Sequence, residues 1–205
     1  KEAFESTRQP YENLLDVLQR AGLAVLWLDN QSGCKGLCDR VEQANTFNQK
    51  TLGLCADGAC FDAVMLSGLD QRIAALDPQR RARGVVLVLH QMGSHGPAYF
   101  KRVPDAFKNF VPVCESNVLQ DCPRAELVNA YDNTLVYTDH VLAQLARWLA
   151  DKAAQGPHDT AMVYVSDHGE SLGENNLYLH GLPYALAPDT QTHVPMLSWI
   201  SAPMA

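Results

Sequence analysis

The chain has 205 residues, enough for one sizeable domain or a large piece of one, and its 47% hydrophobic and 19% charged residues exclude a mostly disordered protein. Its net charge is −7 and its Lys and Arg residues are scattered, so it lacks the basic patch of a nucleic-acid-binding protein. No run of apolar residues approaches the roughly 18–20 that a membrane-spanning helix needs.

Helical and strand-like patterns alternate along the chain. The predicted elements are a helix over 10–20, a buried strand over 23–28, a helix over 61–76, a strand over 84–89, a helix over 126–149, a buried strand over 161–165 and a strand over 194–200. The continuous apolar run at 84–89 is typical of a strand in the middle of a parallel sheet. Strands that alternate with helices predict an α/β protein with a mainly parallel sheet.

Polar residues gather where three of these strands end. They lie at positions 29–30, 90–95 and 166–170, and sites of open α/β sheets lie outside the carboxyl ends of the strands. The sequence contains no G-x-S-x-G, no P-loop and no dinucleotide-binding fingerprint. Serine-hydrolase and nucleotide-motor functions are therefore excluded.

The six cysteines form three close pairs in sequence, each within a loop rich in Gly, Asp or Pro. They are Cys34, Cys38, Cys55, Cys60, Cys114 and Cys122. Six cysteines allow about 15 disulfide connectivities, of which three short loops are the simplest. Disulfides would indicate an oxidising compartment. The alternative is a metal cluster, although none of the three pairs has the C-x2-C spacing of zinc sites.

Asp167 and His168 are the sharpest candidates for metal ligands, because a predicted buried strand ends just before them. A carboxylate beside an imidazole suits a divalent metal such as zinc. Gly169, Glu170 and a second histidine at position 180 favour this interpretation. The structural alternative is that Asp167 caps the next turn and that His168 is a buried, hydrogen-bonded histidine.

Two further histidines stand beside glycine in predicted loops. His95 lies between Gly93 and Gly96, and His180 precedes Gly181, twelve positions after His168. Glycine lets the backbone approach a ligand closely, and functional residues concentrate in loops. His95 and His180 are therefore candidates for metal or phosphate binding, against the alternative of polar loops that pack on themselves. His90 is expected to have a structural role.

Lys35 lies in a tight loop between Cys34 and Cys38. If these two cysteines are bridged, the ammonium group is held in place and suits a phosphate. The alternative is an ordinary solvated lysine, because most lysines lie at the surface.

Several of these segments together resemble one family, the lipid A phosphoethanolamine transferases, which include the mobile colistin-resistance enzymes. The resemblance covers nearly the whole chain. It is carried by Ser166-Asp-His-Gly-Glu-Ser-Leu-Gly-Glu174, Tyr178-Leu-His-Gly-Leu-Pro183, Leu89-His-Gln-Met-Gly-Ser-His-Gly-Pro-Ala-Tyr99, Ala130-Tyr-Asp-Asn133, Pro112-Val-Cys-Glu115, Asp29-Asn30 and Gly33-Cys-Lys-Gly36.

The resemblance implies an α/β/α sandwich of the alkaline-phosphatase/sulfatase superfamily. It implies a zinc-dependent enzyme at the periplasmic face of the bacterial inner membrane, anchored by an N-terminal transmembrane domain. Such an enzyme transfers phosphoethanolamine from phosphatidylethanolamine to a lipid A phosphate through a phospho-threonine intermediate. The product confers resistance to polymyxins such as colistin.

The resemblance also assigns roles to individual residues. Asp167 and His168 match family zinc ligands, and His95 and His180 match residues that bind substrate phosphate or an additional zinc. Lys35 matches a position near the substrate. The cysteines match the family disulfides Cys34–Cys38, Cys55–Cys60 and Cys114–Cys122.

The family also has a Glu ligand and a nucleophilic Thr upstream of the segment that matches Lys1. Residues 1–205 are therefore expected to form the C-terminal part of one periplasmic catalytic domain, without a nucleophile and inactive alone. Two alternatives stay open: a phosphatase- or sulfatase-type hydrolase of the same superfamily, and a non-catalytic metal-binding fragment.

Overall fold

The computed structural model describes residues 11–47, 53–56 and 58–202. These residues belong to two compact units, Lys1–Met92 and Gly93–Ala205. The first unit contains α2 (Leu14–Arg20), β1 (Ala24–Asp29), β2 (Glu42–Asn45), β3 (Cys55–Ala56), β4 (Ala59–Cys60), the 3-10 helix η1 (Asp62–Leu66), α3 (Leu69–Ala75), α4 (Pro78–Arg81) and β5 (Val85–His90).

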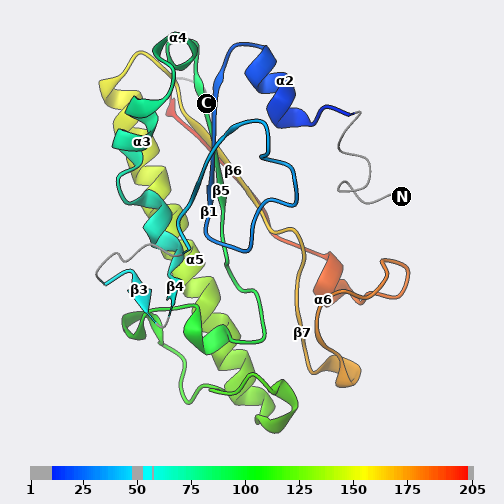
Figure 1. Ribbon diagram of the computed structural model, residues 1–205. Helices are drawn as coiled ribbons and strands as arrows, with labels where there is room; N and C mark the ends of the chain where they lie inside the picture. The colour runs from blue at the N-terminus through cyan, green and yellow to red at the C-terminus, as the bar shows by residue number, and fades with distance from the viewer. Residues whose placement is uncertain (1–10, 48–52, 57, 203–205) are drawn as a thin grey trace. The chain divides into compact units, whose positions relative to one another are not determined.

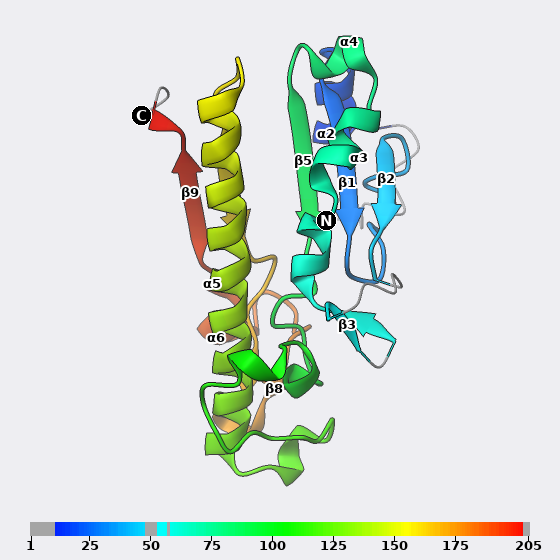
Figure 2. The same cartoon turned by 90° about the vertical axis from the view of Figure 1, so that its left-hand side faces the viewer.

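A parallel three-stranded sheet organises the first unit. Its order is β2-β1-β5, and Figure 2 shows the three strands side by side. Every residue of β1 is buried, which confirms the strand expected there. Leu15 and Leu18 of α2 pack on Val25 and Trp27 of β1. The helix follows the capping residue Asn13, while Pro10, where the expected helix began, lies outside the described residues.

Two expectations for the first unit need correction. The segment 61–76 is not one helix, because Gly68 adopts a left-handed conformation (φ +67°) between η1 and α3. The strand expected at 84–89 exists as β5, but its residues are only half-buried. Within the described residues β5 pairs with β1 alone, so it lies at an edge of this sheet rather than in its middle.

The second unit is built on the long helix α5 (Arg124–Gln155), which runs from green to yellow in Figure 1. Three 3-10 helices precede α5: η2 (Tyr99–Lys101), η3 (Asp105–Phe107) and η4 (Leu119–Asp121). The elements after α5 are β6 (Ala161–Val165), β7 (Ser171–Leu172), the 3-10 helix η5 (Glu174–Asn176), β8 (Tyr178–Leu179), α6 (Asp189–Thr192) and β9 (Met196–Ile200). The long helix expected at 126–149 is therefore confirmed, and it extends from Arg124 to Gln155. Leu135, although apolar, is 45% exposed on this helix.

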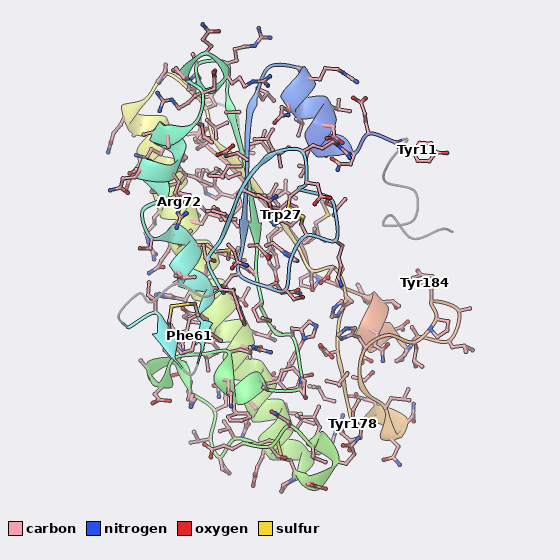
Figure 3. All side chains as sticks on the ribbon, in the orientation of Figure 1. Tyr11, Trp27, Phe61, Arg72, Tyr178 and Tyr184 are labelled. Atoms are coloured by element: carbon pink, nitrogen blue, oxygen red, sulfur yellow. A yellow bond between two sulfur atoms is a disulfide. The ribbon has the colours of Figure 1, made fainter. Side chains whose placement is uncertain are left out.

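The core of the second unit forms where α5 meets the loop segments before it. Leu127 and Ala130 of α5 pack with Tyr99, Cys114 and Leu119, all of them buried. The short antiparallel pair of β7 and β8 packs on this core through Leu172 and Tyr178, the latter labelled in Figure 3. This packing places the loop after β8 next to the start of the unit.

The strands β6 and β9 confirm the two expected at 161–165 and 194–200, and they pair antiparallel. Val163 and Val165 of β6 are 65% and 56% exposed, so the expectation of a buried strand is wrong for these side chains. The parallel strands of the molecule that the structure describes are thus those of the first unit.

All three expected disulfides are present, Cys34–Cys38, Cys55–Cys60 and Cys114–Cys122. The second bridge closes the hairpin of β3 and β4, and the third fixes the loop before α5. Because no cysteine remains free, the alternative of a cysteine metal cluster is wrong. Within the described residues no helix, not even the 32-residue α5, is apolar enough to cross a membrane.

Candidate metal centre

Three histidines from distant parts of the second unit come together. His95 lies in the loop near the start of the unit, His168 follows β6, and His180 follows β8. One ring nitrogen from each lies within 4.8 Å of the others, the arrangement of a potential metal site. The ring centroids of His168 and His180 are 3.6 Å apart, and those of His95 and His180 are 5.1 Å apart. The structure therefore groups three of the five residues expected at the metal and phosphate.

All three rings use the same nitrogen to contact the protein. Each Nδ1 faces a carbonyl or carboxylate oxygen, which accepts a hydrogen bond, so these contacts assign the proton to Nδ1 in all three rings. The acceptors are the carbonyl of Gly96 at 2.7 Å from His95, the carbonyl of Gly169 at 3.0 Å from His168, and Oε1 of Glu170 at 3.0 Å from His180. This tautomer leaves the lone pair of Nε2 free on all three rings. Neutral imidazole held at Nδ1 by an oxygen is the usual state of a metal-binding histidine.

Glycine is required beside two of these histidines. A Cβ on Gly169 would lie 2.1 Å from the carbonyl oxygen of Thr190, and one on Gly96 would lie 2.4 Å from Leu179. The close approach at Gly96 is that of the Leu179 side chain from β8, and the approach of a ligand expected there stays a prediction. The loop of His168 thus packs against the backbone of Thr190, and the loop of His95 against a side chain of β8.

Asp167 lies at the edge of the histidine group. Its side chain is 78% exposed, and its Oδ1 accepts a hydrogen bond from the backbone N–H of His168. Its Oδ2 lies 3.8 Å from Nε2 of His168. Two ligand atoms at about 2.0–2.2 Å from a tetrahedral zinc lie roughly 3.4 Å apart, so this spacing is compatible with a shared ion.

Glu170 was not assigned a role from the sequence, although it stands two residues after His168. Its side chain is only 3% exposed, and it contacts the ring of His180 and the backbone after His95. Nearby, burial and then the negative charge of Glu170 raise the pKa of the Tyr99 hydroxyl above its ordinary value. The signal in the sequence was its place in the His-Gly-Glu run, but its contacts depend on the folded chain.

The candidate residues of the first unit have different surroundings. Lys35 is exposed, in a turn that the Cys34–Cys38 disulfide closes. Nδ1 of His90 lies 2.6 Å from Oδ1 of buried Asp29, in agreement with a structural role. Asn30 is fully buried, and its amide donates to Oδ1 of Asp62.

The family model for sulfatases matches residues 2–203. The chain belongs to the sulfatase family. The expected α/β fold with a parallel sheet, of the alkaline-phosphatase/sulfatase type, is confirmed by this match and by solved structures. The soluble domain of lipooligosaccharide phosphoethanolamine transferase A from Neisseria meningitidis has a TM-score of 0.85 and 43% identity, over 93% of this chain and 55% of that chain.

Further solved structures and curated relatives are also similar. The C-terminal periplasmic domain of phosphoethanolamine transferase EptC from Campylobacter jejuni has a TM-score of 0.80 and 39% identity, over 94% of this chain and 57% of that chain. Phosphoethanolamine transferase EptA of Salmonella typhimurium (strain LT2) is 51% identical over 93% of this chain and 34% of the relative. Phosphatidylethanolamine transferase Mcr-1 of Escherichia coli is 45% identical over 94% of this chain and 36% of the relative. This sulfatase-family chain thus spans about a third of these curated relatives, and its expected resemblance to phosphoethanolamine transferases is confirmed.

Proposed function

We propose that this chain is part of a zinc-dependent transferase that moves phosphoethanolamine from phosphatidylethanolamine to a phosphate of lipid A. The observation that carries the proposal is the group of three imidazoles with free Nε2 lone pairs. It occurs in a chain 51% identical to a phosphoethanolamine transferase. Imidazole and carboxylate ligands suit zinc, which fits the donor set of this site.

The proposed ligands divide into two roles. Asp167 and His168 hold the zinc, in agreement with the 3.8 Å between their facing atoms. His95 and His180 bind an additional zinc through their Nε2 lone pairs or, when Nε2 is protonated as well, donate hydrogen bonds to phosphate oxygens of the substrate. Lys35 supplies a cationic donor for a phosphate group, because an ammonium makes strong charge-assisted hydrogen bonds.

The transfer has two steps that keep the phosphoethanolamine group intact. A threonine hydroxyl attacks the phosphorus of phosphatidylethanolamine, its proton passes to the diacylglycerol that leaves, and a phospho-threonine that still carries the ethanolamine remains. An oxygen of the lipid A phosphate then attacks the same phosphorus and frees the threonine. When bound, zinc supplies Lewis-acid polarisation and lowers the pKa of the hydroxyl. In the form that is also protonated at Nε2, His95 and His180 stabilise negative charge on the phosphoryl oxygens, which is the largest contribution that a protein makes to such a transfer. The threonine is assigned to no residue within 1–205.

The proposed location is the periplasmic face of the bacterial inner membrane. Three disulfides support an oxidising compartment, and the similar domain from Campylobacter jejuni is periplasmic. The membrane would be reached through a transmembrane domain outside residues 1–205. Added phosphoethanolamine reduces the negative charge of lipid A, so polymyxin and colistin resistance is the expected phenotype.

The test is expression of the whole enzyme in a polymyxin-sensitive bacterium, followed by mass spectrometry of lipid A. The proposal expects a lipid A species heavier by one phosphoethanolamine group and a raised colistin tolerance. It expects neither with His168→Ala at equal protein level. If the enzyme is active and correctly inserted but lipid A stays unmodified, the proposal that lipid A is the acceptor is wrong. Core-sugar modification in the same spectra would identify a related transferase.

A hydrolase is the second candidate, because the family also contains sulfatases. Release of inorganic phosphate or sulfate from aryl monoesters by the same enzyme, without lipid A modification, would favour it. Bound zinc without either activity would favour a non-catalytic metal-binding module.

A further inference from the structure

One buried carboxylate connects the three segments that carry the histidines. Glu170 stands two residues after His168, and its Oε1 accepts a hydrogen bond from Nδ1 of His180 at 3.0 Å. The same oxygen accepts a second bond, at 3.2 Å, from the backbone N–H of Gly96, the residue that follows His95. A single oxygen atom therefore joins segments that are 74 residues apart in the chain.

The position of Glu170 is energetically costly. Its side chain is 97% buried, given an exposed fraction of 3%, and a carboxylate loses strong hydration when it is buried. Its second oxygen, Oε2, is also buried, and the hydroxyl of buried Tyr99 is a hydrogen-bonding neighbour of this carboxylate. A carboxylate that served only to fill space would be replaced by an apolar side chain at a gain in stability. Its contacts with the histidine segments offer the reason for its presence.

We propose that Glu170 is a positioning residue, whose carboxylate holds the His180 ring and the backbone after His95 so that the three Nε2 atoms converge. The inference rests on the metal-binding role proposed above and deepens it. An acceptor at Nδ1 fixes both the tautomer and the orientation of a metal-binding imidazole. His95 and His168 obtain this acceptor from the carbonyls of the glycines that follow them, whereas His180 depends on the side chain of Glu170.

Two substitutions at Glu170 separate positioning from charge. Glu170→Gln keeps an oxygen that can accept from His180, so it retains most of the positioning. Glu170→Ala removes the acceptor. Glu174→Gln is the matched control, because this partly buried glutamate four residues later bonds to Arg124 and to the backbone of Leu172.

The first measurement is zinc affinity of the intact protein, by competition with a chromophoric chelator. Loss of an outer-shell partner of a metal ligand typically weakens binding about 10–100-fold, and that loss is expected for Glu170→Ala. Glu170→Gln should weaken binding less than about tenfold, and Glu174→Gln should leave it unchanged. Equal zinc affinity for Glu170→Ala and the wild type would overturn the proposal.

The second measurement needs no metal and no activity. In metal-free protein with ¹⁵N-labelled histidine, the ring nitrogen shifts of His180 should report the proton on Nδ1, both in the wild type and in Glu170→Gln. Glu170→Ala should shift His180 toward the tautomer with the proton on Nε2 and leave His168 unchanged. A wild-type His180 protonated on Nε2 would overturn the proposal even if Glu170→Ala failed to fold.

These two readouts separate failure of the inference from failure of the function. If the wild type binds no zinc but His180 shows the expected tautomer and responds to Glu170→Ala, the positioning stands and the zinc function fails. If zinc binds but Glu170→Ala changes neither the His180 tautomer nor the zinc affinity, the proposed function stands and the positioning role fails.

Discussion

Both units carry polar side chains where strands end, but among the described residues it is in the second unit that ring nitrogens of several histidines converge. In the first unit Asp29 contacts His90, and Asn30 bonds to Asp62 and to the carbonyl of Cys60. In the second unit three imidazoles use Nδ1 to contact the protein, and one ring nitrogen of each lies within 4.8 Å of the others. A polar group whose partners lie within the protein stabilises the fold. Convergent groups without such partners indicate a ligand.

The largest expected difference comes from removing one histidine in each unit. His168→Ala in the intact enzyme should abolish retained zinc and reduce transfer by orders of magnitude, because it removes a ligand that no neighbour replaces. His90→Ala should leave the zinc content unchanged and lower the melting temperature, because Asp29 loses its partner.

Zinc per chain by inductively coupled plasma mass spectrometry, with lipid A analysis alongside, checks both variants. Wild-type zinc in His168→Ala, or lost zinc in His90→Ala with intact secondary structure, would reverse the contrast between the units.

A smaller effect is expected from two glycines that flank the histidines. Gly169→Ala would bring a Cβ to 2.1 Å from the Thr190 carbonyl, so the loop must move, at a cost of about 1–3 kcal/mol in unfolding free energy. Gly93→Ala is the matched control, because its Cβ meets no atom within 4 Å and only its φ of +54° is unfavourable. That conformation costs roughly 1–2 kcal/mol.

Urea unfolding gives the stabilities, and zinc affinity gives the effect on the site. Gly169→Ala should lower both, since the displaced carbonyl of Gly169 holds the ring of His168. Equal zinc affinity of Gly169→Ala and Gly93→Ala would mean that this loop does not position the ring.

Strong local patterns explain what could be predicted from the sequence. The strands β1, β5, β6 and β9 and the helix α5 could be predicted because their apolar periodicity or continuous apolar runs are local signals, which do not depend on the rest of the chain. The strand β2 was missed because Glu-Gln-Ala-Asn has no such pattern; these residues form a strand through their pairing with β1. The prediction of one helix through Gly68 was wrong because the left-handed conformation of this residue ends one helical segment and starts another, although the apolar periodicity continues.

The candidate site could be predicted only in its parts. His95, His168 and His180 could be selected from the sequence because each lies near a glycine, in a predicted loop or directly after a predicted strand. The fold then brings the three histidines together. The roles of Asp167 and Lys35 stay predictions. Glu170 could not be assigned, because its contacts with Gly96 and His180 join residues up to 74 positions apart, and no local pattern records such contacts.

The smallest expected effect concerns a surface ion pair in each unit. A hydrogen bond from Arg40 lowers the pKa of Asp16 below its usual 3.8 in the first unit, and Lys108 lowers the pKa of Asp105 in the second. A carboxyl group with a lowered folded pKa adds stability above its unfolded pKa and loses it as the pH falls through the folded value. Both contributions should therefore be present at pH 5, begin to decline below about pH 4 and disappear below the lowered folded pKa.

The two pairs should differ in size because their carboxylates differ in burial. The Asp16 side chain is 9% exposed and the Asp105 side chain 94% exposed, so solvent screens the second pair far more. Asp16→Asn should cost at most about 1 kcal/mol at pH 7, with less of a difference from the wild type at pH 3. Asp105→Asn should be indistinguishable from the wild type at both pH values. Urea unfolding at pH 7 and pH 3 measures this, and equal costs for both variants would mean that burial does not set the strength of these pairs.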